Sequence, residues 1–262
     1  KVDKNEISGL YKPLQLTKEF ESFKKLGKQS GAIFYVPAWN TSKMDPTTGF
    51  VNLLSVKYEN MEKSKEFINK IKDINFKEDD CGKYYEFHID FNEFTDKGKD
   101  TKTDWNICSF GKRIDNARNQ KGDFESKMID LTNEFHNLFK KYGINYNSNL
   151  KEDILNVKEA KFYKEFINLF KLMLQIRNSE SNEKVDFLQS PVKNNKGEFF
   201  NSNNVNGNEA PENADANGAY NIARKGLWIV NQIKTMPDSQ MHKIKLAMKN
   251  QEWLLFAQKG NV

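Results

Sequence analysis

One stretch near the C-terminal end constrains the fold more than any other part of the sequence. Residues 212–223 read ENADANGAYNIA, and they open a run in which apolar residues recur at helical spacing. The spacing predicts a helix that begins near Asp215 and turns one apolar stripe toward the core. The residues of this predicted stripe are Ala219, Ile222, Ala223, Gly226, Ile229, Val230 and Ile233.

Asp215 has two interpretations from this pattern alone. A helix N-terminus favours an ionised carboxylate, and a carboxylate held on a rigid element is a ligand that Mg²⁺ accepts. The alternative is that Asp215 is only the N-cap of the helix. The pattern favours neither, although a capping box is excluded because Gly218 would occupy the third helical position.

Composition sets broad limits on the fold and on function. With 262 residues the chain is long enough for one large domain or two small ones. Charged residues make up 29%, but 20 Phe, 9 Tyr and 4 Trp supply aromatic surface for a core. The net charge of +5 permits nucleic-acid binding without requiring it.

Several features bear on location and on metal binding. Cys81 and Cys108 are the only cysteines and form no CxxC pair, so neither a disulfide framework nor a zinc site is indicated. No apolar run approaches the roughly 18–20 residues of a membrane span, and no signal-peptide pattern opens the chain. We expect a cytoplasmic protein with no membrane partner. Because the sequence does not begin with Met, we also expect a fragment of a longer polypeptide.

Helix and strand patterns alternate along the rest of the chain. The N-terminal half is expected to contain a helix at 17–27, a strand at 31–36, a turn-rich loop at 39–50, a helix at 62–74, and strands at 85–91 and 104–110 that pair as a hairpin. The C-terminal half is expected to contain a helix capped by Thr132 and ended by Gly143, a helix from about Glu159, a loop at 193–209 and a closing helix packed on the sheet.

Two groups of basic residues stand out. Lys112, Arg113 and Arg118 follow the second strand of the hairpin, beside Trp105. They suit a phosphate backbone, and they equally suit an ordinary solvated turn. Arg177 falls on the apolar stripe of the helix from Glu159, either as a cation at the helix C-terminus or as a guanidinium that grips a phosphate.

Three motifs resemble those of one protein family. Residues 215–222, DANGAYNI, are similar to the third RuvC-like motif of type V CRISPR effector nucleases and their transposon-encoded relatives. Residues 174–179, LQIRNS, with 186–192, DFLQSPV, resemble the Nuc region of the type V-A effectors, also called Cas-twelve-a or Cpf-one. Residues 41–49, TSKMDPTTG, resemble half of a zinc ribbon in which Asp45 and Thr48 replace the two cysteines. No zinc is expected there, because neither replacement is a zinc-type ligand.

The resemblance covers roughly residues 14–257 and implies an α/β (α+β) fold. It divides the chain into a RuvC-like, RNase H-type portion and an inserted domain of mixed helices and strands. Residues 1–50 and 209–262 are expected to be RuvC-like segments, the first after the second RuvC motif and the second containing the third. Residues 51–208 are expected to form the Nuc domain, which places single-stranded DNA at the RuvC site.

The family's function implies the chemistry and the partners. The parent protein is expected to be a bacterial or archaeal RNA-guided DNA endonuclease that uses about two Mg²⁺ ions. Its partners are the target and displaced DNA strands, a CRISPR guide RNA bound through the parent, and the remaining N-terminal part of the effector. By resemblance, Asp215 is a metal ligand, Arg177 contacts a phosphate, and Asp186 orients Arg177 or a substrate group. Candidate nucleic-acid contacts are Lys43, Lys112, Arg113 and Arg118.

The other metal-binding carboxylates of the family lie upstream of the sequence, so the isolated chain is expected to be catalytically incomplete. One alternative is therefore a nucleic-acid-binding module with no activity of its own. A second is a compact transposon-type nuclease, which the lost cysteines and the long insert disfavour. A structural protein with no nucleic-acid role would leave the three motifs unexplained.

Overall fold

The computed structural model describes residues 36–118, 124–180, 185–205, 209–237 and 248–259. The helix expected at 17–27 and nearly all of the strand expected at 31–36 lie outside these ranges. The described chain is a mixed α+β fold with small antiparallel sheets, which confirms the mixed class. The RNase H-type arrangement stays a prediction.

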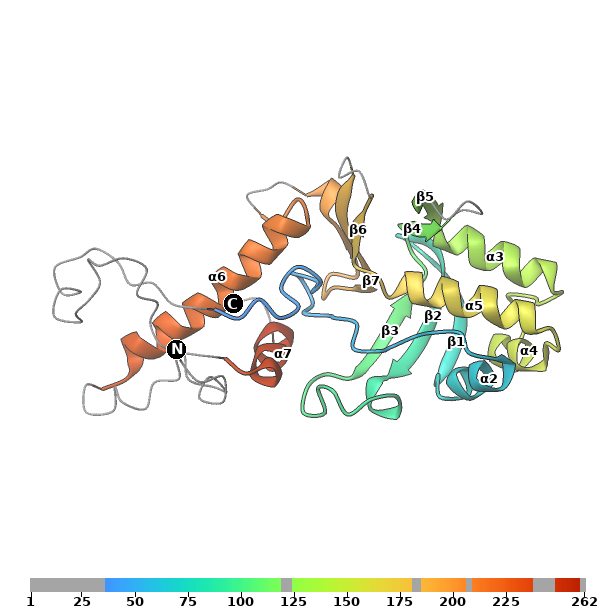
Figure 1. Cartoon of the computed structure of the whole chain (residues 1–262), viewed down its shortest axis with the longest axis horizontal. Helices are drawn as coiled ribbons and strands as arrows, with labels where there is room; N and C mark the ends of the chain where they lie inside the picture. Colours follow the sequence, from blue (N-terminus) through green and yellow to red (C-terminus); the bar gives the residue numbers. More distant parts are fainter. Residues whose placement is uncertain (1–35, 119–123, 181–184, 206–208, 238–247, 260–262) are drawn as a thin grey trace.

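The elements follow one another in the order shown in Figure 1. The described strands are β1 (Asp73–Asp79), β2 (Gly82–Asp90), β3 (Asp104–Cys108), β4 (Lys112–Arg118), β5 (Phe124–Asp130), β6 (Arg177–Ser179), β7 (Asp186–Lys193) and β8 (Phe199–Asn201). The described helices are α2 (Met61–Asn69), α3 (Leu131–Lys141), α4 (Leu150–Asn156), α5 (Ala160–Met173), α6 (Ala214–Thr235) and α7 (Asn250–Gln258).

The main core lies between the sheet β1-β2-β3 and helices α2 to α5, which gather at one end of the molecule (Figure 1). The central strand, β2, alternates buried and part-exposed residues as its sequence predicts, and it pairs antiparallel with β3 through Ile89 and Trp105. The expected hairpin is confirmed. Phe87 of β2 meets Phe135 of α3 and Phe170 of α5, each at a ring-centroid distance of 5.4 Å.

Two predicted boundaries in this region are wrong. The helix expected at 62–74 ends at Asn69, and Ile74 instead belongs to β1, where it pairs with Phe87 of β2. The helix α3 is capped by Asp130 and not by Thr132, because the Asp130 carboxylate accepts a hydrogen bond from the backbone N–H of Asn133. The Thr132 hydroxyl donates instead to the carbonyl of Ser109.

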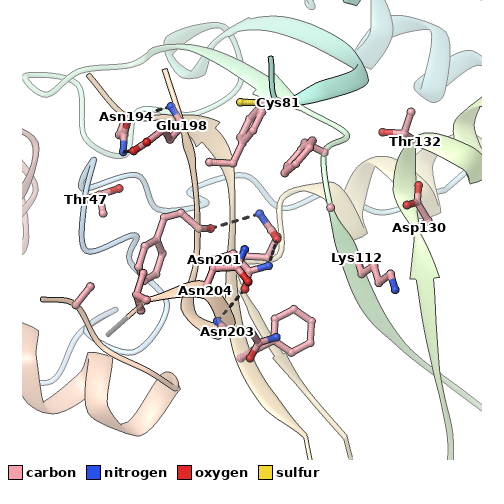
Figure 2. A pocket seen from close by; sticks show the side chains of 18 of the residues that line it. Thr47, Cys81, Lys112, Asp130, Thr132, Asn194, Glu198, Asn201, Asn203 and Asn204 are labelled. Carbon is pink, nitrogen blue, oxygen red and sulfur yellow. Dashed lines mark hydrogen bonds between the residues drawn. The ribbon is translucent and has the colours of Figure 1, made fainter. Parts of the chain in front are cut away.

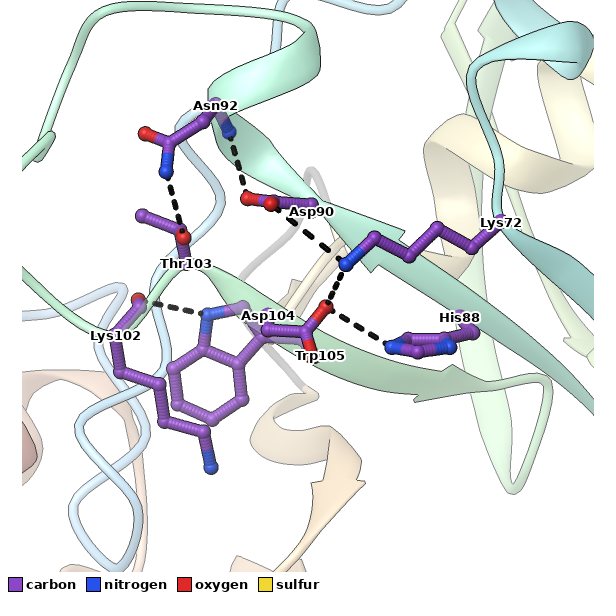
Figure 3. A network of polar contacts seen from close by, with 8 residues as sticks. All are labelled: Lys72, His88, Asp90, Asn92, Lys102, Thr103, Asp104 and Trp105. Carbon is purple, nitrogen blue, oxygen red and sulfur yellow. Dashed lines mark hydrogen bonds and ion pairs between the residues drawn. The ribbon is translucent and has the colours of Figure 1, made fainter.

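A polar network joins β2 and β3 to Lys72, the residue that precedes β1 (Figure 3). The Lys72 ammonium lies 2.9 Å from one Asp104 carboxylate oxygen and 3.7 Å from an oxygen of Asp90. His88 Nε2 contacts the same Asp104 oxygen at 2.9 Å. The hydrogen bond from Lys72 lowers the pKa of Asp104. Because these ion pairs are largely open to solvent, each contributes little to the free energy of unfolding.

The basic segment after β3 is a strand and not a turn. Residues 112–118 form β4, which pairs with β5. Asn178 of β6 joins β4 to the third sheet, β6-β7-β8, because its side-chain oxygen accepts a hydrogen bond from Ile114 N–H at 3.0 Å. Gln175 donates to the Ile114 carbonyl at 3.1 Å.

The helix predicted after residue 212 is present as α6, but it buries a different face. Its N-cap is Asn213, whose side chain accepts from Ala216 N–H at 2.8 Å. The buried side chains on α6 include Asn217, Asn221 and Lys225. Of the predicted stripe Ile229 is buried, whereas Ala219 and Ala223 are exposed. The physical reason is that the buried face binds main-chain carbonyls of the segment near residues 37–44.

The closing helix is α7, and it packs against α6 and the loop between β2 and β3. Trp253 lies under the Lys225 ammonium at 4.6 Å from the ring centroid, and Gln258 accepts a hydrogen bond from Lys102 N–H at 2.8 Å. None of the helices in the described ranges has the length and apolar character needed to cross a membrane.

Candidate functional site

The hairpin of β6 and β7 puts Arg177 and Asp186 on one face. Ser179 lies directly opposite Asp186, and Arg177 is two residues from Ser179, so all three side chains point to the same side. Arg177 Nε lies 3.4 Å from Asp186 Oδ1. The prediction that Arg177 continues the stripe of the helix from Glu159 is wrong, because α5 ends at Met173.

The first turn of α6 brings Asp215 to the same place. Arg177 Nη2 lies 3.9 Å from Asp215 Oδ1. The Asp215 side chain is 89% exposed, against 22% for Asp186. Since Asn213 is the N-cap, capping does not account for Asp215. The structure therefore brings together three side chains that the sequence singles out and that lie up to 38 positions apart.

The contact between Arg177 and Asp186 is close but incomplete. Arg177 Nε and Asp186 Oδ1 are both buried atoms, and neither has a hydrogen-bond partner. Buried polar atoms without partners are costly and uncommon in folded proteins. Hydrogen bonds at catalytic sites are often long without substrate and tighten when it binds. Both atoms are closed to solvent, so a bound substrate would complete this contact by drawing the two side chains together.

The loop that faces this hairpin is held by the polar face of α6. Asn217 donates to the carbonyl of Met44 at 2.8 Å, and Asn221 donates to the carbonyl of Thr41 at 2.8 Å. The Lys225 ammonium donates to the carbonyl of Pro37 at 2.7 Å, and burial lowers its pKa to about 8. These bonds fix the position of Lys43, which is exposed on the same loop.

A groove of about 490 Å³ connects the loop with the hairpin. Lys43, Lys171 and Arg177 line it, and no carboxylate is among its lining residues in the described part of the chain. Asn40, Asn52, Asn116, Gln175 and Ser179 supply its polar groups. Among the described residues Arg177 contacts Asp186 and Asp215, whereas no ion pair links Lys43 or Lys171 to an acid. These cations, together with the amide and hydroxyl groups, suit a phosphate backbone.

The remaining basic candidates lie elsewhere. Lys112 is exposed and lines a separate cavity of about 1030 Å³ (Figure 2). Arg113 is fully buried, its Nη1 donates to the carbonyls of Phe110 and Lys112, and burial lowers its pKa to about 9. The assignment of Arg113 as a phosphate contact is corrected, because its guanidinium is buried and a nucleic-acid phosphate cannot reach it. Arg118 ends β4, and its side chain lies outside the described part of the structure.

Asp45, in the segment that resembles half of a zinc ribbon, forms a compact hydrogen-bonded knot. The buried carboxylate accepts from the hydroxyl of Thr48 at 2.7 Å, from Thr47 N–H at 2.7 Å and from the hydroxyl of Ser190 at 2.6 Å. The residues at the two cysteine positions thus bond to each other. Ser190 belongs to β7, so the knot ties the loop to the strand that carries Asp186.

The described residues fit one ligand position of a magnesium site and not a whole one. Asp215 offers an exposed carboxylate, which is the donor chemistry that Mg²⁺ prefers. Asp186 faces Arg177, and the described ranges hold no group of three or more His, Cys, Asp or Glu side chains that could bind a metal.

Sequence reasoning missed Lys171 and Asn116 as residues of the groove. Lys171 lies four positions before Gln175 and six before Arg177, so its place just before the motif of residues 174–179 could have marked it as a candidate substrate contact. Asn116 had no such signal, because β4 was not predicted as a strand and its approach to β6 depends on tertiary packing.

Comparison with protein families identifies the central part of the chain. Residues 44–204 match the model of NUC, a nuclease domain. The match covers more than half of the sequence and includes Arg177, Asp186 and every residue of the groove except Asn40 and Lys43. A Nuc nuclease domain is thereby confirmed, and its origin in a type V-A effector stays a prediction.

Proposed function

The chain belongs to the Nuc nuclease-domain family, and from this premise we propose that it is the C-terminal nuclease part of a type V-A CRISPR RNA-guided DNA endonuclease. A nuclease domain implies a nucleic-acid substrate. The proposed reaction is hydrolysis of phosphodiester bonds in single-stranded DNA, with guide RNA pairing supplying the sequence specificity. The parent protein works in a bacterial or archaeal cytoplasm. The observation that carries the proposal is the convergence of Arg177, Asp186 and Asp215 beside a cationic groove.

Arg177 binds a phosphate next to the bond that is cut. Its planar guanidinium can donate two parallel hydrogen bonds to phosphate oxygens, which a lysine cannot do. Asp186, 3.4 Å from Nε, holds the guanidinium at its inner side and leaves the outer nitrogens for the substrate. The outer Nη2 lies 3.9 Å from the exposed Asp215, a weak contact that a phosphate can replace.

Asp215 supplies one ligand of a magnesium site that carboxylates outside the described residues complete. Magnesium in such a site activates water and stabilises the leaving oxygen. Asp215 lies in the first turn of α6, at the end of the helix where the backbone dipole is positive. When Arg177 turns toward the phosphate, Asp215 loses its only close cation among the described residues and is free for the metal.

The test is magnesium-dependent cleavage of end-labelled single-stranded DNA by the complete parent protein loaded with guide RNA. We expect Asp215→Asn and Arg177→Ala each to reduce the cleavage rate by about 10²-fold or more, and Arg177→Lys to recover little because it lacks the planar fork. Lys97→Ala, an exposed lysine away from the groove, is the control. A normal rate for Asp215→Asn would remove Asp215 from the metal site.

A second candidate is a nucleic-acid-binding module without activity of its own. It is favoured by one observation, that Asp215 is a single exposed carboxylate in the described site. The chain alone would then bind single-stranded DNA without cutting it, and would still not cut after the upstream portion of the parent is restored. Cutting only after restoration supports the proposed nuclease.

A further inference from the structure

The exposed face of α5 carries a row of lysines. Lys161, Lys164 and Lys171 are all exposed, with the exposed Asn168 between them. Spacings of three and seven residues put the four side chains on one face of a helix. At 1.5 Å per residue, the row from the first lysine to the last is about 15 Å long.

The row stands on a rigid support. The opposite face of α5 is buried in the aromatic core through Phe166, Phe170 and Met173, each 0% exposed. Within the described residues, Lys161 lies 4.0 Å from Glu165, and no ion pair links Lys164 or Lys171 to an acid. The helix therefore presents fixed positive charges that are mostly uncompensated.

The row leads into the candidate site. Lys171, at its C-terminal end, lines the groove together with Lys43 and Arg177. In Figure 1 the C-terminal end of α5 is directed toward β6 and β7, the hairpin that carries Arg177 and Asp186. The charged face of the helix and the groove are thus continuous through one residue.

We propose that the lysine row of α5 binds the phosphate backbone of a DNA single strand and guides it along the groove to Arg177. This inference rests on the proposed function, because it assigns the path of the substrate to the same site. Lysine ammonium groups interact with phosphates as point charges and read no base sequence. The row accordingly contributes affinity and direction, and the chemistry stays with the residues at the end of the groove.

The experiment measures binding without cleavage. The anisotropy of a fluorescein-labelled oligothymidylate of about 20 nucleotides, an ample length for one binding site, is followed with the 262-residue chain, without magnesium, over a series of salt concentrations. The variant carries Lys161→Gln, Lys164→Gln and Lys171→Gln. Glutamine removes the charge but keeps an unbranched polar side chain of similar helix propensity. Its matched control carries Lys57→Gln, Lys97→Gln and Lys99→Gln, three exposed lysines away from α5.

Single-strand binding loses about 0.7 in the slope of log affinity against log salt for each phosphate contact removed. We expect the row variant to lose about two units of slope and its affinity at about 0.1 M salt to fall by tenfold or more. The control should keep the wild-type slope. Equal losses in both variants, or no loss in the row variant, would overturn the inference, because either result shows that α5 makes no specific backbone contact. Circular dichroism and the unfolding midpoint verify that both variants are folded.

A cleavage measurement separates this inference from the proposed function. In the guide-loaded parent, the row variant should raise KM several-fold and leave kcat close to wild type, because the row binds substrate and transition state alike. If the parent cuts no DNA while the salt dependence of binding still falls in the row variant, the nuclease proposal fails and the DNA-binding role of the lysine row stands. If the parent cuts DNA and the row variant has a normal KM and a normal salt dependence of binding, only the proposed role of the lysine row fails.

Discussion

At the scale of single residues, Asp45 holds together the loop that resembles half of a zinc ribbon. A zinc ion would tie two cysteines of this loop to two more elsewhere, whereas here one buried carboxylate gathers hydroxyl and backbone donors from Thr47, Thr48 and Ser190. The carboxylate is fully buried and every contact is 2.7 Å or shorter except the bond from Thr48 N–H at 3.3 Å. The loop that carries Lys43 is therefore held by this side chain as well as by the polar face of α6.

We predict that Asp45→Ala lowers the free energy of unfolding by about 3 kcal/mol, because several buried donors lose their acceptor at once. Asp45→Asn keeps the size of the side chain but loses one acceptor oxygen, so it should cost less than Asp45→Ala. Urea unfolding measures both, with Asp96→Ala, an exposed acid in the β2–β3 loop, as the control. An Asp45→Ala protein as stable as the control variant would show that the knot is dispensable.

Much of the candidate site could be predicted at the residue scale, but not the elements that carry it. Asp186, Arg177 and Asp215 were found from their motifs, and the structure puts both carboxylates within ion-pair distance of Arg177. Arg177 was assigned to the wrong element because position 177 happens to continue a helical spacing that ends at Met173. Arg113 reads as a surface cation in sequence, since nothing local reveals that tertiary packing covers it.

At the scale of elements, the polar face of α6 positions the loop beside the groove. Asn221 is fully buried, donates to the Thr41 carbonyl at 2.8 Å and to Asn217 Oδ1 at 3.0 Å, and accepts from Arg224. We predict that Asn221→Ala lowers the free energy of unfolding by about 1–3 kcal/mol, because a buried carbonyl loses its donor.

The same change should weaken binding of single-stranded DNA, because Lys43 moves with the loop. Binding is measured by anisotropy beside urea unfolding of the same protein, and Asn168→Ala on the exposed face of α5 controls for the loss of an amide. If Asn221→Ala loses stability but binds DNA normally, the loop is not a necessary part of the groove.

Another element-scale contact joins the β1–β2 turn to the end of β7. Hydrogen bonds from Lys193 and Tyr84 lower the pKa of Asp79 from 3.8 to about 2. The stabilisation is therefore present above pH 3.8 and is lost as the pH falls toward 2, since the unfolded chain takes up the proton first. We predict that Asp79→Asn is less stable than wild type at neutral pH and that this difference shrinks across that window. Acid unfolding of both proteins by circular dichroism measures it, and a difference that is constant with pH would contradict the pairing.

Elements with strong side-chain patterns were predictable, and those held by backbone and polar contacts were not. The alternation of β2 and the aromatic stripe of α5 report burial directly, and both agree with the structure. The strand β1 has the polar sequence DINFKED, whose place in the sheet comes from pairing with β2 and not from its own pattern. In α6 the apolar residues suggested the wrong inward face, because the amide and ammonium groups of the other face bind buried carbonyls.

At the scale of the whole molecule, α7 connects parts that are far apart in sequence. Leu254 and Ala257 are buried, Gln251 and Gln258 bond to the β2–β3 loop, and Trp253 lies under cations of α6. The helix thus contacts both the β2–β3 loop of the Nuc domain and α6, the helix that carries Asp215. We therefore expect the docking of α7 to influence the distance between Asp215 and the β6–β7 hairpin.

The helix α7 packs closely against Gly49. This glycine has φ +69°, and a Cβ there would lie 2.4 Å from the carbonyl oxygen of Ala257. Gly143 has nearly the same backbone angle, φ +72°, with no atom within 4 Å of its virtual Cβ. Comparing alanine substitutions at the two glycines therefore distinguishes two effects. Alanine at either position strains the backbone, but only alanine at Gly49 would also collide with α7.

We predict that Gly143→Ala costs about 1 kcal/mol from backbone strain and that Gly49→Ala costs about 2–4 kcal/mol because overpacking adds to it. Hydrogen exchange should show amides of α7 less protected in Gly49→Ala and unchanged in Gly143→Ala. In the guide-loaded parent, Gly49→Ala should also slow DNA cleavage, because Asp215 is no longer held opposite Arg177. Equal stability losses for both variants, with α7 protected in each, would mean that α7 adjusts without cost and does not set the geometry of the site.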